Sequence, residues 1–189
     1  AGNRAAAPLE GPGNWREAWG PSRAGSMALT SYAIALGSNR RGRHGGPAET
    51  VRSAAEMLSV EHLSSIHATP ALGPAGRGFA NAAALLSSDM EPAELLVRLK
   101  AIERDFGRRG GRRWGPRVLD LDIILWSGGL YEDDNLIIPH PAFRDRLFVL
   151  EPLAEIAPDW RDPVTGATVR QLLHRLRRRN PVDPRPAGT

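Results

Sequence analysis

The sequence predicts an α+β fold: a ferredoxin-like βαββαβ core, in which an antiparallel sheet carries its helices on one face, plus C-terminal additions. Three observations predict it. Apolar residues repeat with the period of strands in some segments and of helices in others, turn residues separate these segments, and their order is strand, helix, strand, strand, helix, strand. With 189 residues, 41% of them hydrophobic, the chain is long enough for one domain with its own core.

Each element has local signals of its own. The first strand ends at "GSN" (37–39), which is typical of a turn, and Pro47 begins the first helix. Ser88 and Asp89 are candidate N-caps of the second helix, and Gly107 ends it. The expected elements are strands over 32–36, 61–68, 79–88 and 117–126, core helices over 47–59 and between 89 and 107, and additional helices over 148–156 and 168–179.

Composition divides the chain into three parts. Residues 1–26 are rich in Gly, Pro and Ala without periodicity, and we expect them to form a disordered N-terminal arm. Residues 27–180 are expected to form the folded domain, and residues 181–189 a short C-terminal tail.

The overall composition limits the chemistry and the partners. The chain has no cysteine, which excludes disulfides, thiolate catalysis and cysteine-based zinc sites and agrees with a reducing cytoplasm. We expect a cytoplasmic location without a membrane partner, because no apolar run could span a bilayer and the N-terminus lacks the apolar core of a signal peptide. The net charge of +4 and the pI near 10.5 favour anionic partners, such as nucleotides or nucleic acids.

Two carboxylates stand out inside the last core strand. Asp120 and Asp122 alternate with leucine and isoleucine, so both point to one face of the strand. If the helices cover the apolar face, the carboxylates look out from the uncovered face. Carboxylates within about 7 Å repel each other unless a cation lies between them, and Mg²⁺ suits this role because it binds carboxylate and phosphate oxygens. The alternative is a pair of solvated aspartates on an exposed sheet face.

Arginines crowd the segment before this pair. "GRRGGRR" (107–113) is basic and rich in glycine, and Arg117 follows it. An acidic pair beside arginines is what phosphoryl transfer needs, because a metal ion neutralises the phosphates and guanidinium groups hold the developing charge. The segment could also be a flexible, solvated loop. The two interpretations are compatible if the segment is a flexible lid that closes on its ligand.

Two further segments contain candidate binding residues. His140 lies between two prolines at the end of a strand-like run, where it is either structural or a contact to phosphate or nucleotide. Phe79 is either a core residue or a pocket wall that stacks on a flat heterocycle, with Asn81 as a nearby amide.

These segments resemble the motifs of the 6-hydroxymethyl-7,8-dihydropterin pyrophosphokinase family of folate biosynthesis. The likeness runs from about Tyr32 to Leu173, so residues 27–180 are expected to be a pyrophosphokinase domain. The fold of the family, a ferredoxin-like α+β sandwich, agrees with the predicted element order. The matching motifs are "IALGSN" (34–39), "TPALGP" (69–74), "FANAA" (79–83), "RWGPRVLDLDIILW" (113–126), "IPHP" (138–141) and "RLFVLEPLAEIAPDW" (146–160).

The resemblance implies a reaction and its catalytic residues. Pyrophosphate would pass from ATP, the co-substrate, to the hydroxymethyl group of a dihydropterin, giving AMP and the pterin diphosphate. Asp120 and Asp122 match the residues that hold two Mg²⁺ ions, and Asp120 also matches the residue that guides the hydroxyl proton. Arg108 and Arg117 match catalytic arginines of the loop region, and Trp114 matches a tryptophan that closes over the site.

The resemblance also implies the binding residues. The pterin would lie between Phe79 and Phe148, with Asn81 bonded to its ring edge. One departure is Asn135, which stands where some members have an arginine near the nucleotide. Further pterin contacts are implied for Thr69, Pro70 and Leu72, and ATP contacts for Glu103, Trp114, Ile123, His140, Pro141 and Arg146.

Two other functions compete with this hypothesis. Ferredoxin-like sheets also bind RNA, but such modules need exposed aromatic residues on the central strands, whereas this strand carries two acids. Another two-metal nucleotide-transfer enzyme would explain Asp120 and Asp122 equally well but leaves "IPHP" and "RLFVL" unexplained. We therefore expect a monomer that binds ATP and a dihydropterin and does not bind nucleic acid.

Overall fold

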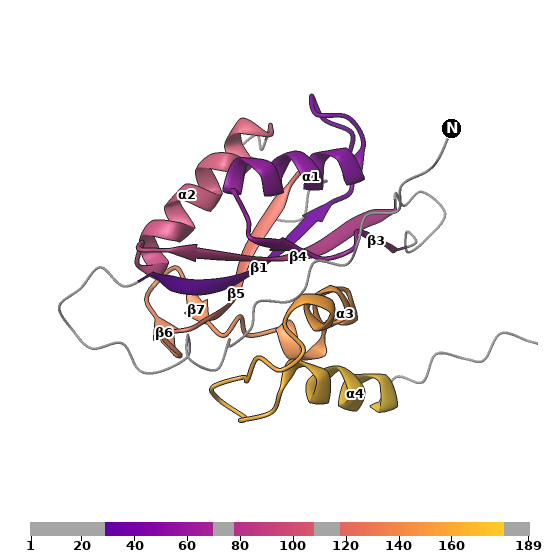
Figure 1. Cartoon of the computed structure of the whole chain (residues 1–189). Helices are drawn as coiled ribbons and strands as arrows, with labels where there is room; N and C mark the ends of the chain where they lie inside the picture. The colour runs from indigo at the N-terminus through magenta and orange to yellow at the C-terminus, as the bar shows by residue number, and fades with distance from the viewer. Residues whose placement is uncertain (1–28, 70–77, 108–117, 180–189) are drawn as a thin grey trace, which may run out of the picture.

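The computed structural model describes residues 29–69, 78–107 and 118–179. The predicted arm (1–26) and tail (181–189) lie outside these residues. The described part forms a larger antiparallel sheet between two layers of helices, with a small two-stranded sheet beside it (Figure 1). This arrangement confirms the α+β class, and the core elements follow the predicted order with the second strand split in two.

The larger sheet has the strand order β2-β4-β1-β5, and β3 also pairs with β4. The register places the short strands β2 and β3 along one edge of β4, so β5 forms the opposite edge of the sheet. The core elements are β1 (Thr30–Ser38), α1 (Pro47–Leu58), β2 (His62–Leu63), β3 (His67–Thr69), β4 (Phe79–Ser88), α2 (Pro92–Asp105) and β5 (Asp120–Trp126).

Two strand predictions are corrected by the structure. The predicted turn at "GSN" is wrong, because β1 continues through Gly37 and Ser38, which pair with β4. The predicted strand over 61–68 is interrupted at Ser64, whose N–H donates to the carbonyl of Ala83 while its Oγ accepts the N–H of the same residue, both at 2.9 Å. These bonds keep Ser64 beside β4 but interrupt the regular strand pairing, so the predicted single strand is observed as two strands, β2 and β3.

The start of α2 also differs from the prediction. Ser88 and Asp89 do not cap the helix, because β4 extends through Ser88. The N-cap is Glu91, which forms a capping box with Glu94: the N–H of Glu91 donates to Oε2 of Glu94 at 3.0 Å. Pro92 then occupies the first helical position, where its missing N–H is not needed.

Helices cover both faces of the sheet, and each face has its own apolar core. Leu119, Leu121 and Ile123 pack under α1 and α2, as expected for the apolar face of β5. The expectation that the other face is uncovered is wrong, since α3 (Leu147–Ile156) and α4 (Val169–Arg179) pack there (Figure 1). They cover only part of that face, because Ile124 and Leu125 of β5 are buried in the second core whereas Asp120 and Asp122 are only partly buried.

The connection from β5 to α3 is held in place by a buried ion pair. It contains β6 (Tyr131–Glu132), β7 (Ile137–Ile138) and a 3₁₀ turn (Phe143–Asp145). Within that turn Arg144 donates two hydrogen bonds of 2.7 Å to the fully buried carboxylate of Asp162, in the loop before α4. Within the part of the chain that the structure describes, every helix is too short or too polar to span a lipid bilayer.

Candidate functional site

The candidate site is built on one row of residues across the sheet. Asn81 on β4 pairs with Gly37 on β1, and Gly37 pairs with Asp120 on β5. Directly opposed residues of antiparallel strands point to the same face, so the Asn81 amide and the Asp120 carboxylate share a face with only a hydrogen atom between them. At Gly37 an added methyl group would lie 3.4 Å from Oδ1 of Asn81. The glycine therefore places no side chain between the amide and the carboxylate.

Asp122 belongs to the next row on the same face. It pairs with Ala35, which pairs with Ala83 on β4, so small side chains surround it. Both aspartates are partly buried. The described residues contain no group of three or more acidic or histidine side chains that could hold a metal ion. Two carboxylates are nevertheless a donor set that fits Mg²⁺, because Mg²⁺ in phosphate-binding sites commonly takes one or two carboxylates plus phosphate oxygens and water.

His140 lies beside the aspartates. Its backbone N–H donates to the carbonyl of Ile124 at 3.0 Å, which fixes it against β5. Burial lowers the pKa of His140 below its ordinary value of 6.5, and the nearby charge of Arg146 lowers it further, while the carboxylates of Asp122 and Asp120 oppose this change. Ring atom Nδ1 accepts the N–H of Ala142 at 3.1 Å, so a neutral His140 carries its proton on Nε2. That nitrogen is a hydrogen-bond donor without a full charge.

Among the described residues predicted to bind the pterin, Phe79 and Asn81 lie on β4, Phe148 lies at the start of α3 and Thr69 lies at the end of β3. Asn81 is 7% exposed and belongs to the same face as the aspartates. Phe79 precedes it by two residues and pairs with the backbone of Thr69. Phe79 and Phe148 are large apolar side chains that remain 44% and 42% exposed, which is unusual for phenylalanine. The guanidinium of Arg146 lies 5.7 Å from the centre of the Phe148 ring.

Glu103 joins α2 to the edge of β5. Its side chain is fully buried, and Oε1 accepts the backbone N–H of Leu121 at 2.9 Å and the Lys100 ammonium at 2.7 Å. Lys100 also donates to the carbonyl of Leu121 at 3.2 Å. Leu121 lies between the two aspartates in the chain, so these bonds fix the strand that carries them. Ile123 is only 2% exposed and packs in the first core, so its side chain does not line an open site.

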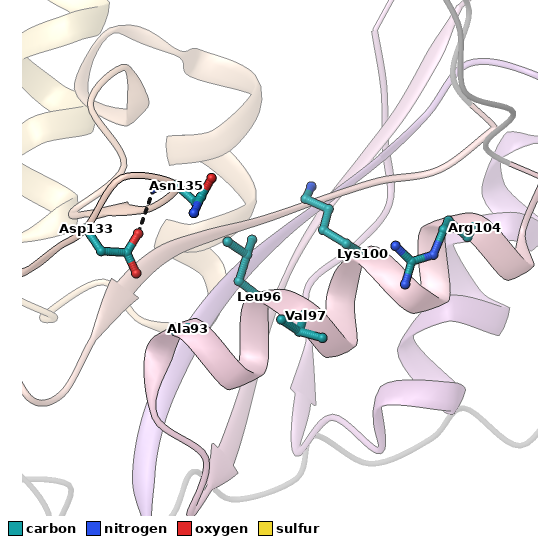
Figure 2. Close-up of a pocket in the computed structure, with 7 residues that line it drawn as sticks. All are labelled: Ala93, Leu96, Val97, Lys100, Arg104, Asp133 and Asn135. Atoms are coloured by element: carbon teal, nitrogen blue, oxygen red, sulfur yellow. Dashed lines mark hydrogen bonds between the residues drawn. The ribbon is translucent and has the colours of Figure 1, made fainter.

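A groove of about 320 Å³ runs along the outer side of α2. Figure 2 shows Leu96 and Lys100 extending from α2. Asp133 and Asn135, in the turn between β6 and β7, line the opposite side of the groove. Oδ1 of Asp133 accepts the N–H of Asn135 at 2.7 Å and holds this turn in shape. The sequence does not single out Leu96 and Lys100, because nothing in a helical repeat shows which exposed positions face a neighbouring turn. The lining residues are Ala93, Leu96, Val97, Lys100, Arg104, Asp133 and Asn135.

The structure therefore gathers some of the predicted site residues and leaves others aside. Asp120, Asp122, Asn81 and His140 share one region of the sheet, and Pro141 is exposed next to His140. Glu103 lies at the outer edge of β5. The predicted residues Pro70, Leu72, Arg108, Trp114 and Arg117 lie outside the described residues.

Comparison with known proteins identifies the family. Residues 33–158 match the sequence profile of the family described as 7,8-dihydro-6-hydroxymethylpterin-pyrophosphokinase (HPPK). This match covers more than half of the chain and includes every described residue of the candidate site. The chain belongs to the HPPK family. The resemblance inferred from the sequence motifs is thereby confirmed, and the HPPK family is one of enzymes, namely diphosphokinases.

Individual HPPK relatives agree with this assignment. The chain is 45% identical over 119 residues to the 2-amino-4-hydroxy-6-hydroxymethyldihydropteridine pyrophosphokinase of Synechocystis, covering 63% of this chain and 61% of that protein. It is 38% identical to the pyrophosphokinase of the same name from Methylorubrum extorquens, over 78% of this chain and 94% of that protein. A crystal structure of wild-type Plasmodium falciparum HPPK-DHPS with pteroate has a TM-score of 0.59 at 14% identity, over 80% of this chain and 43% of that one. This last likeness supports the fold alone.

Proposed function

We propose that this protein transfers pyrophosphate from ATP to 6-hydroxymethyl-7,8-dihydropterin, giving AMP and the pterin diphosphate, in folate biosynthesis. The observation that carries the proposal is the row across the sheet in which Asn81 and Asp120 flank Gly37, with Asp122 in the next row. It combines an amide that can recognise a heterocycle edge with carboxylates that suit a metal-bound phosphate. Membership of the HPPK family supports the same reaction.

Asp120 and Asp122 would hold the two Mg²⁺ ions of the proposed site. Bound Mg²⁺ would neutralise the phosphate oxygens and place the nucleotide for attack by the hydroxyl group. The protein contributes the separation and direction of the two carboxylates, which β5 fixes through its pairing with β1 and its bonds to Glu103. His140 supports this role, because its neutral ring can donate from Nε2 to a phosphate oxygen without adding a charge beside the carboxylates.

The nucleotide base is proposed to occupy the groove on α2. The groove lies at the outer edge of β5, while the carboxylates lie on the face of the same strand, so one extended nucleotide could reach both. Leu96 offers an apolar surface for a flat base, and Lys100 and Asn135 offer polar groups at its rim. Lys100 is the only lysine of the chain, so ATP should protect a single lysine from acylation, and peptide mapping by mass spectrometry would show it.

The dihydropterin is proposed to lie between Phe79 and Phe148, with its ring edge on Asn81. The exposure of both phenylalanine rings supports a stacking role. The hydroxyl oxygen of the pterin would attack the β-phosphorus of ATP, the bond from that phosphorus to the oxygen shared with the α-phosphate would break, and AMP would leave with that oxygen. Asp120 is the group proposed to guide the hydroxyl proton away. Arg108, Arg117 and Trp114 remain proposed contacts of the loop outside the described residues.

We expect a cytoplasmic monomer, and we expect no binding to nucleic acid or to membranes. The described residues of β1 and of the edge strand β5 support the absence of nucleic-acid binding, because their aromatic side chains do not form an exposed stacking surface. Tyr32 is fully buried, and the ring of Trp126 is stacked on it at 6.2 Å between centroids.

The decisive experiment is to incubate the protein with ATP, Mg²⁺ and 6-hydroxymethyl-7,8-dihydropterin and to identify the nucleotide product. AMP is expected, and formation of ADP or the absence of any pterin-dependent product would refute the proposal. Calorimetry with Mg²⁺ and a non-hydrolysable ATP analogue should give a binding signal that is lost when Asp120→Asn and Asp122→Asn are combined. An unchanged signal in that double variant would refute the role of the carboxylates.

A further inference from the structure

Helix α3 reaches from one edge of the sheet to the other. At its N-terminal end, Arg146 is close enough to His140 to lower the pKa of that residue, and His140 is bonded to β5. Near its C-terminal end, Glu155 contacts His67 on β3. About three strand spacings, or roughly 14 Å, separate β5 from β3, and the helix rises about 13.5 Å between Arg146 and Glu155. The helix thus has the length needed to span the sheet.

Glu155 attaches this helix to β3 through both carboxylate oxygens. Oε2 accepts the backbone N–H of Ser65 at 2.8 Å, and Oε1 lies 2.5 Å from Nε2 of His67. Burial raises the pKa of Glu155, but the hydrogen bonds from Ser65 and His67 outweigh this effect and hold the pKa below its ordinary value of 4.5. Glu155 is therefore ionised at neutral pH and acts as a charged anchor between segments 88 residues apart in the chain.

Both ends of this anchor are linked to residues of the proposed pterin site. Phe148 precedes Glu155 by seven residues, which is about two helical turns, so the two side chains lie on the same side of α3. His67 pairs directly with Asn81, and two residues further along β3 the backbone pairs with Phe79. The contact between His67 and Glu155 thus joins the helix that carries one proposed wall of the pterin site to the strands that carry the other.

We infer that the His67–Glu155 contact is a positioning contact for the dihydropterin. It holds Phe148 at a fixed distance from Phe79 and Asn81, so the two rings are in place before the heterocycle enters between them. This inference rests on the proposed function. The contact should act more strongly on the pterin than on the nucleotide. The groove proposed for the base is built from α2 and the β6–β7 turn at the far edge of the sheet, and Arg146, the implied ATP contact at the start of α3, lies near His140 at the end of the helix away from Glu155.

The chain offers a matched control on the same helix. Glu151 lies one turn before Glu155 and has a similar side-chain exposure, 32% against 36%. Its carboxylate pairs with Arg177 on α4 at 2.9 Å, so it ties α3 to another helix and not to the sheet. A general loss of α3 stability would appear in Glu151→Ala as well, whereas a loss of pterin positioning would not.

The test compares steady-state kinetics of AMP formation. In Glu155→Ala the KM for the dihydropterin should rise about fivefold to tenfold, while the KM for ATP and kcat stay within about twofold of the wild-type values. Glu155→Gln should recover most of the lost affinity, because its amide oxygen can accept the Ser65 N–H while its amide nitrogen donates to Nε2 of His67 in the tautomer protonated on Nδ1. His67→Ala should reproduce Glu155→Ala, and the double variant should be no worse than either single variant. Glu151→Ala should match the wild type.

The outcomes separate this inference from the proposed function. An unchanged KM for the dihydropterin in Glu155→Ala and His67→Ala, or an equal rise in Glu151→Ala, overturns the positioning role in a protein that still forms AMP. A wild-type protein that forms no AMP overturns both. If Glu155→Ala does not fold, His67→Ala breaks the same contact from the strand side and carries the same expectation.

Discussion

Asn81 and Asp120 face each other across Gly37, in a row where β4, β1 and β5 run side by side. The glycine contributes no side chain, so no side chain of β1 lies between the amide and the carboxylate in this row. In a paired strand glycine lowers stability slightly, because it adds no packing and loses more conformational freedom. Its presence here is best explained by the ligand proposed to lie above it.

Gly37→Val should therefore separate stability from activity. A β-branched residue favours strands, so the melting temperature should stay the same or rise, while the isopropyl group fills the space beside Asn81 and AMP formation falls by about tenfold or more. Gly37→Ala should have a much smaller effect, because a methyl group at 3.4 Å from Asn81 makes ordinary contact. Thermal melting and the AMP assay check both variants, and full activity in Gly37→Val would show that the space is not used.

Asp122→Ala should abolish turnover and leave the fold intact. The loss of one of two carboxylates should lower the rate of AMP formation by about two to three orders of magnitude, as for other groups that stabilise developing charge. Removing one charge of a repelling pair should not lower the melting temperature of the protein without metal. Asp89→Ala, at an exposed aspartate in the turn between β4 and α2, is the control and should keep normal activity. A collapsed melting temperature in Asp122→Ala would mean that the carboxylate is structural.

Glu103→Ala should weaken both the fold and nucleotide binding. The substitution leaves the Leu121 N–H and the Lys100 ammonium without their carboxylate partner, so the free energy of unfolding should fall by about 2–3 kcal/mol. ATP affinity should fall as well, because Lys100 lines the groove proposed for the base. Denaturant titration and calorimetry with an ATP analogue measure the two effects.

The control for Glu103→Ala is Glu94→Ala on the same helix. Glu94 is exposed and belongs to the capping box, so its loss should cost about 1 kcal/mol of stability without changing ATP affinity. If both variants bind the nucleotide like the wild type, the groove on α2 is not the base site.

In Asp162→Asn the free energy of unfolding should change less between neutral and acid pH than it does in the wild type. Burial raises the pKa of Asp162, but the hydrogen bonds from Arg144, Thr165 and Val164 outweigh it and hold the pKa below 3.8. A carboxyl group with a lowered pKa stabilises the folded state above its unfolded pKa, and this contribution is lost as the pH falls through the folded pKa. The wild type should exceed the variant by about 3 kcal/mol near pH 7.

Denaturant unfolding of both proteins between acid and neutral pH tests this expectation. The stability difference should shrink as the pH falls below 3.8, where the wild-type carboxyl group also becomes protonated. Asp159→Asn is the control, because its pairing with Arg170 lies at the surface and should contribute less than about 1 kcal/mol. A difference that stays constant over the whole range would exclude ionised Asp162 as the source of the stability.

Much of the fold could be predicted because local patterns and tertiary packing agree. The apolar stripe of α2 and the alternation along β5 each match the face that is buried. Where the local patterns gave a wrong strand boundary, hydrogen bonds to a segment far away in the chain determined the structure. Gly37 and Ser38 resemble a turn in sequence, yet β4 pairs with them and extends the strand. Ser64 lies within an apparently continuous strand, yet its bonds to Ala83 interrupt it.

The sequence by itself determined that this protein has an α+β fold, that Asp120 and Asp122 share one face of a strand, and that its motifs are those of the HPPK family. The first two properties follow from residue spacing that repeats every few positions along the chain, and the third follows from the residues of the motifs themselves. Only the tertiary structure decided that Asn81 lies across Gly37 from Asp120, that His140 lies beside them, and that Glu155 joins α3 to β3. Strand register and helix docking set these distances, and both depend on packing between segments that are far apart in the chain.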